Sequence, residues 1–111
     1  MVSELQMRQQ QARKQQQELN ENRRKKHLVV ARALRDPLCS REVVLSAMQQ
    51  VRLWREKNLC SSDYIEAWEA LLEQPVQAAN MLEDQSQYAV QLRQNSPFVS
   101  VMRKHERLHA A

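Results

Sequence analysis

The residues with the clearest chemical potential lie at the end of the sequence, where His105, Glu106 and His109 form the pattern His-Glu-x-x-His. On a helix this spacing places two imidazoles one turn apart with a carboxylate beside them, as in zinc peptidases that activate a water molecule. A catalytic zinc needs three protein ligands, and in such peptidases the third lies downstream, whereas only two alanines follow here. We therefore expect no metal site at this position, and a metal-binding hydrolase is the remote alternative.

Glu66, Glu69 and Glu73 form a second group, because their spacing places three carboxylates on one face of a helix. Three carboxylates on an outward face are typical of a solvated stripe. The functional alternative is an acidic surface that binds cations, such as the basic cluster Arg23 to Lys26 of this chain or of a second copy. Each exposed ion pair would add only about 0.2–1 kcal/mol.

Serine and cysteine nucleophiles lack the surroundings that activate them in enzymes. The sequence contains no glycine, so it has neither the Gly-x-Ser-x-Gly turn of hydrolases nor the glycine-rich loops that bind dinucleotides and phosphates. Its two cysteines, Cys39 and Cys60, have no histidine nearby in the sequence and are too few for a disulfide framework. We expect a protein that is not an enzyme and that has no catalytic residue and no cofactor.

A run of four cations, Arg23 to Lys26, precedes the first strongly apolar segment. Cations at this density are typical of surfaces that contact phosphates. The segment contains no aromatic side chain, so recognition of single strands by base stacking is disfavoured. The predicted nucleic-acid-binding residues are Arg13, Lys14, Arg23, Arg24, Lys25 and Lys26.

The distribution of charge divides the 111 residues into segments of opposite sign. Residues 1–35 carry nine Lys and Arg against three Glu, whereas residues 36–84 carry four against nine Asp and Glu. A chain of this length forms one domain. Within it we expect a basic, Gln-rich helical arm at 1–27, a helical body at 28–100 and a C-terminal tail at 101–111.

The N-terminal arm combines high helix propensity with few apolar residues. Leu5, Ala12 and Leu19 recur every seven positions, but their companions Arg8 and Gln15 are polar. A second apolar heptad position is missing, which argues against a strong coiled coil. The segment is therefore either a solvated helix or an arm that becomes ordered on a partner. Its helix should end at Asp36, because Pro37 disfavours helical geometry in the preceding residue.

The body is predicted to be all-α. Without glycine, the tight turns of β-hairpins are disfavoured, and apolar residues recur at helical spacing. The fold class we expect is a small four- to five-helix bundle preceded by a long basic, Gln-rich N-terminal helix. The expected elements are a helix at about 41–58 capped by Ser40, a helix capped by Ser62 or Asp63, a helix with Pro75 at its first position, and a short helix capped by Ser86.

The second and third helices should form a hairpin that is the centre of the core, pinned by Trp54 and Trp68, with Phe98 folding back onto it. The residues predicted to be buried are Val43, Val44, Ala47, Met48, Val51 and Trp54, then Tyr64, Ile65, Trp68, Leu71 and Leu72, then Val76, Ala79 and Leu82, and finally Tyr88, Ala89 and Leu92. Two leucines fall outside this core face and, with the acidic stripe, form the predicted protein-partner surface: Leu45, Leu53, Glu66, Glu69 and Glu73.

Residues 40–100 resemble small helical bacterial proteins, including antitoxin-like partners of toxin modules. The resemblance rests on the order of Trp54, Trp68 with Leu71-Leu72, Pro75, an acidic stretch and the segment from Leu92 to Phe98, and no functional residue is carried over from it. It implies a small regulatory protein that acts by binding a partner protein. The alternative is a nucleic-acid-binding regulator, as a homodimer joined through the arm.

The sequence also bears on location. No run approaches the roughly 20 apolar residues of a membrane span, and the N-terminus is polar. We expect a cytoplasmic protein with no membrane partner.

Overall fold

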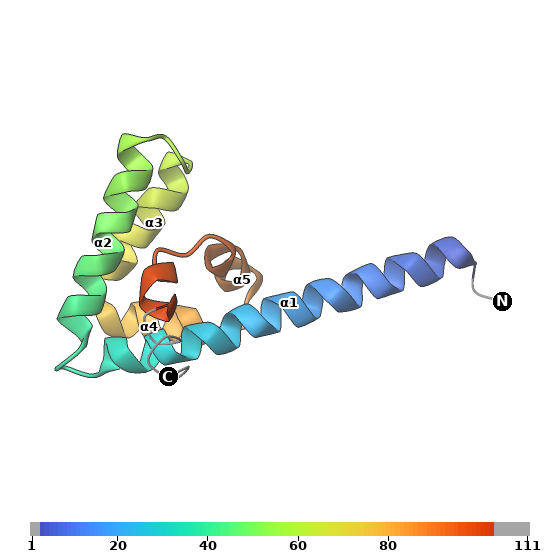
Figure 1. The fold of residues 1–111 in the computed structure, drawn as a ribbon, viewed down its shortest axis with the longest axis horizontal. Coiled ribbons are helices and arrows are strands. Elements are labelled where there is room, and N and C mark those ends of the chain that lie inside the picture. Colours follow the sequence, from blue (N-terminus) through green and yellow to red (C-terminus); the bar gives the residue numbers. More distant parts are fainter. Residues whose placement is uncertain (1–2, 104–111) are drawn as a thin grey trace.

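The computed structural model describes residues 3–103, and these residues contain helices and no strand. The helices are α1 (Glu4–Arg35), α2 (Ser40–Glu56), α3 (Ser62–Leu72), α4 (Pro75–Glu83) and α5 (Gln87–Gln94), as Figure 1 shows. Residues 99–103 are also helical. The predicted all-α class, with a long first helix, is confirmed.

Local sequence signals set most of the helix ends. Ser3 begins α1 with a capping box, in which its hydroxyl accepts from the Gln6 N–H and the Gln6 side chain accepts from the Ser3 N–H. The helix ends at Asp36, whose backbone is extended before Pro37, as expected. Pro75 begins α4, and the hydroxyl of Ser86 accepts from the third residue beyond it at the start of α5, also as expected.

Two of the predicted caps are wrong. Ser40 is the first helical residue of α2 rather than its cap, because Asp36 organises the preceding turn by accepting the Leu38 N–H. The cap position is occupied by Cys39, without a side-chain hydrogen bond to the helix. On α3 the cap is Ser61, one residue earlier than predicted, and its hydroxyl accepts from Tyr64 N–H.

The core lies where α2, α4 and α5 meet the C-terminal half of α1, with α3 packed on α2 and α4, and α1 makes its most extensive contact with α4. Trp68 is fully buried and packs edge-to-face on Phe98, with ring centroids 5.5 Å apart. Trp54 lies against Tyr64 across the α2–α3 hairpin. The predicted return of Phe98 onto this hairpin is therefore confirmed.

Three residues predicted to be buried are exposed instead: Met48, Val76 and Tyr88. Each lies at the edge of the apolar face of its helix, where the position of the neighbouring helix decides whether a side chain is covered. On α4 the inner position belongs to Ala78, because α1 packs against the side that carries Ala78, Ala79 and Leu82.

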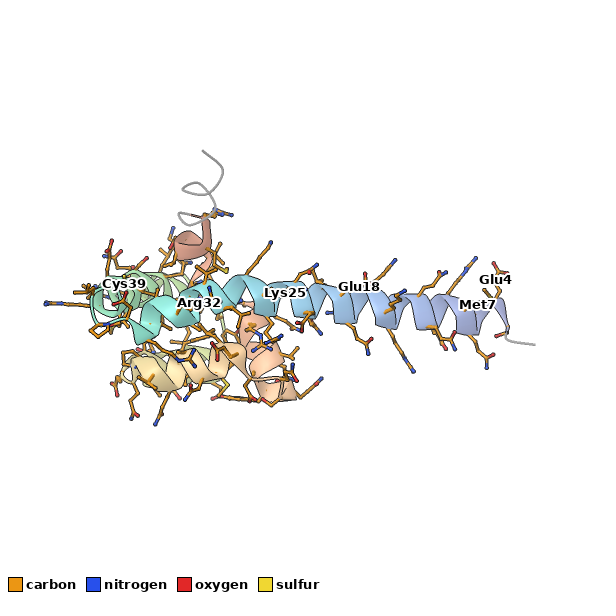
Figure 2. The ribbon with its side chains drawn as sticks, turned by 90° about the horizontal axis from the view of Figure 1, so that it is seen from below. Glu4, Met7, Glu18, Lys25, Arg32 and Cys39 are labelled. Carbon is orange, nitrogen blue, oxygen red and sulfur yellow. The ribbon has the colours of Figure 1, made fainter. Side chains whose placement is uncertain are left out.

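The first half of α1 extends beyond the body (Figure 1). Every residue from Ser3 to Leu19 is exposed, and the first partly covered residue is Asn20. We call residues 3–19 the projecting segment. Figure 2 shows the side chains near Met7 and Glu18 standing out around the helix with no other element beside them.

Candidate interaction surfaces

The projecting segment carries apolar side chains that the body does not cover. Leu5 is 66% exposed, Met7 52% and Leu19 45%. At 3.6 residues per turn, Leu5, Ala12 and Leu19 lie on the same face of α1 as Val30 and Leu34, which are buried in the body. The apolar face of α1 therefore continues past the body into solvent, which makes it a candidate contact surface.

The predicted basic cluster lies at the junction of the projecting segment and the body, and only part of it faces solvent. Arg24 is half-buried and forms a bidentate pair with Glu21, at 2.7 and 3.1 Å. This hydrogen bond holds the pKa of Glu21 below its usual value and raises that of Arg24. Arg23 is also half-buried and donates to the side-chain oxygen of Asn20.

The other four predicted nucleic-acid-binding residues are exposed: Arg13, Lys14, Lys25 and Lys26. Helical geometry places Lys14 and Lys25 together with exposed Arg32 along the face of α1 opposite the core; Lys25 and Arg32 are labelled in Figure 2. The last cation of α1, Arg35, is bound to α4 instead, where it pairs with Glu83 at 2.5 Å and donates to the Asn80 side chain at 2.7 Å.

A buried polar centre at the base of α1 was missed by sequence reasoning. His27 is only 2% exposed; its Nδ1–H donates to the carbonyl of Arg23 at 2.6 Å, and its Nε2 has no partner among the described residues. Burial lowers the pKa of His27, and the nearby positive charges of Arg93 and Arg23 lower it further, against the effect of the backbone hydrogen bond.

Arg93 of α5 is the second member of this centre. Its buried Nη1 donates to the carbonyl oxygens of Met81 and Leu82, at 3.1 and 3.0 Å. These are carbonyls of the last turn of α4, which lack partners within the helix. Arg93 thus joins α5 to α4 through backbone acceptors, and burial lowers its pKa. A lone arginine beside apolar residues gives no sequence signal for this role.

The predicted partner surface is split by the α2–α3 hairpin. Glu66 and Glu73 are exposed, and Glu69 forms an ion pair with Arg55 of α2. Leu45 is 53% exposed and Leu53 36% exposed, both on α2. Leu53 lies about 80° around that helix from Leu45, on the same side as Ser46, whose hydroxyl contacts that of Ser100. Leu45 with Met48 therefore forms an exposed apolar strip, while the acidic stripe and Leu53 border it on different sides. In the intramolecular pairs described here, the acidic stripe meets Arg55 and not the basic cluster.

Tyr64 of α3 holds the end of α5 and the segment that leads to Phe98 through its hydroxyl group. Its hydroxyl lies 2.5 Å from the carbonyl oxygen of Leu92 and 2.6 Å from that of Asn95, and its single hydrogen is shared between these two acceptors. Burial raises the pKa of this phenol. The Asn95 side chain in turn donates to the Cys60 sulfur at 2.9 Å. A cavity of about 580 Å³ lies beside this segment, between α2 and residues 99–103.

The His-Glu-x-x-His pattern lies outside the described residues. Within residues 3–103 no group of three or more His, Cys, Asp or Glu side chains is arranged to hold a metal ion. The helices of that part of the chain include none with the length and apolar character that crossing a membrane requires. In comparisons with known proteins, no family model, curated protein or solved structure matches this chain.

Proposed function

We propose that this chain is a non-enzymatic binding protein whose ligand is another protein, contacted through the projecting segment and the exposed strip of α2. The observation that carries the proposal is the complete exposure of residues 3–19 on a helix that still bears two leucines and a methionine.

The energetics of helices support this function. A short helix without tertiary packing is marginally stable in water, since most helical stability in proteins comes from packing an apolar face. The projecting segment is helical because it continues the buried part of α1, but nothing in the body covers it. A partner lying on Leu5, Ala12 and Leu19 would supply the missing packing and extend the apolar face of α1.

The exposed strip of α2 offers a second contact. Leu45 and Met48 are one turn apart and both exposed. Arg52 lies on the same side of α2 and places a positive charge beside them. Apolar contacts bordered by charge are typical of specific protein interfaces, in which a few buried side chains carry most of the binding energy. Together with the resemblance of residues 40–100, this favours a small cytoplasmic regulatory or antitoxin-like role.

Capture from native extract followed by mass measurement of the intact complex tests the proposal. We expect a defined complex that is lost in the double variant Leu5→Glu/Leu19→Glu. The matched control, Gln10→Glu/Gln17→Glu, adds the same charge on the opposite face of the helix and should retain the complex. The proposal is contradicted if the protein is recovered alone and is monomeric at low salt, or if both double variants behave like the wild type.

A second candidate function is contact with nucleic-acid phosphates. The alignment of Lys14, Lys25 and Arg32 on the solvent face of α1 favours it, while the pairing of Arg24 with Glu21 weakens it. It predicts retention on DNA or RNA that falls steeply with salt and decreases when Lys14 and Lys25 become Ala. Absence of retention at low salt would remove this candidate.

A further inference from the structure

We propose that the partner of the projecting segment is the same segment of a second copy of this chain, with the two helices antiparallel and a two-fold axis passing beside Ala12. The inference deepens the proposed function and rests on it. It concerns the face of α1 that carries Leu5, Ala12 and Leu19.

The spacing of the apolar residues is self-complementary. Leu5 and Leu19 each lie seven residues, or about two turns, from Ala12. A two-fold axis at Ala12 therefore places Leu5 of each copy against Leu19 of the other, and Ala12 against Ala12. The small side chain at the centre allows the two helices to approach closely. A contact in which the same patch is used by both copies is the geometry of a two-fold dimer.

The length of the uncovered helix fits this arrangement. Residues 3–19 span about 25 Å at 1.5 Å per residue, and the body begins to cover α1 at Asn20. In the antiparallel register, Ser3 of the second copy reaches the level of Glu21. The second helix therefore fills the uncovered length and ends close to the point where the body begins.

Polar groups beside the apolar face find partners within each copy. Arg8 of one copy lies level with Gln16 of the other but on the opposite side of the seam, and it forms an ion pair with Glu4 of its own helix at 2.9 Å. Arg23 likewise donates to the Asn20 side chain of its own helix, so the dimer rests on the apolar seam. The segment carries three cations and two Glu, so self-association meets little net repulsion, whereas a polyanion would gain little from so balanced a charge.

The contact is narrow, which predicts a reversible dimer. Each copy contributes two leucines and one alanine to a single seam. We expect this seam to bury less surface than the roughly 1,200–2,000 Å² of stable interfaces. The dimer should therefore form at high protein concentration and dissociate on dilution.

Cysteine cross-linking of the purified full-length chain tests the inference, in a Cys39→Ser/Cys60→Ser background. Under mild oxidation, Ala12→Cys alone should form a covalent dimer. Leu5→Cys and Leu19→Cys should each stay monomeric alone but link when mixed. The control Gln10→Cys, on the opposite side of the helix, should form no dimer. In parallel, Leu5→Glu/Leu19→Glu should reduce the association constant measured by sedimentation at least tenfold, with an unchanged circular dichroism spectrum.

Other results would overturn the inference. Linkage of Leu5→Cys with itself indicates parallel helices, and loss of the dimer after nuclease treatment indicates a nucleic-acid bridge. A chain that remains monomeric at every concentration, yet loses a captured protein when Leu5 and Leu19 are changed, refutes the second copy and leaves the proposed function intact.

Discussion

The separation of the projecting segment from the body predicts that α1 can be broken at one end without loss of stability. Gln11→Pro removes the N–H that bonds to the carbonyl of Met7 and places the proline ring against that carbonyl, a cost of about 3 kcal/mol or more inside a helix. The seven residues from Glu4 to Gln10 are then too short to remain helical alone. Proline at this point is tolerated as the start of the shortened helix.

The magnitudes follow from the burial of each residue. Unwinding of Glu4 to Gln10 should reduce the helical circular dichroism signal by roughly a tenth, since this signal scales with the number of helical residues. The free energy of unfolding should change by less than about 0.5 kcal/mol, because an exposed residue away from special features contributes little. By contrast, Leu34→Ala in the same helix removes a side chain that is 2% exposed, and should cost about 2–5 kcal/mol.

Urea denaturation, followed by tryptophan fluorescence at low protein concentration, measures the free energy of unfolding of both variants, because Trp54 and Trp68 lie in the body. We expect the midpoint of Gln11→Pro to coincide with that of the wild type and the midpoint of Leu34→Ala to fall clearly. If Gln11→Pro lowers the midpoint as much as Leu34→Ala does, the segment is packed in the monomer and the reasoning is refuted.

Three further predictions concern the body. Phe98→Ala should lower the free energy of unfolding by about 3–5 kcal/mol, because a fully buried ring on Trp68 is removed, while the adjacent, exposed Val99→Ala changes it little; equal effects in thermal melts would contradict the packing. Because burial holds the folded-state pKa of His27 below the ordinary histidine value of 6.5, the unfolded chain takes up the proton first, so stability is highest above pH 6.5 and falls as the pH drops below it. His27→Gln should flatten this slope in urea titrations at several pH values, and an unchanged slope would exclude His27 as its source. Arg93→Met should cost about 1–3 kcal/mol, because two carbonyls lose their donor, and should speed hydrogen exchange at the end of α4; unchanged exchange there would refute the capping role.

Local sequence chemistry predicted much of the fold. Pro37, Pro75 and Ser86 mark helix ends, because a proline ring and a capping hydroxyl act on their nearest neighbours alone. The caps of α2 and α3 were misplaced because several candidate residues lie side by side. The choice among them depends on the turn before the helix, as Asp36 and Ser61 show.

Burial at the edges of apolar faces was harder to predict. Helical periodicity indicates which residues share a face, but the position of the neighbouring helix decides where that face ends, so that Ala78 is buried and Val76 is not. His27 and Arg93 gave no signal, because their role depends on the meeting of α1, α4 and α5. The projecting segment was recognised as weakly apolar, yet only the structure shows that its face continues the buried face of α1.

Hydrogen exchange along α1, compared at low and high protein concentration, tests the central claim most directly. At low concentration the amides of residues 4–19 should exchange rapidly, while those from His27 to Leu34 exchange slowly. At high concentration the first group should become protected, and this protection should be absent in Leu5→Glu/Leu19→Glu. Amides of residues 4–19 that are as slow as those of the core on dilution would contradict the uncovered segment, and amides that stay unprotected at every concentration would contradict its pairing with a second copy.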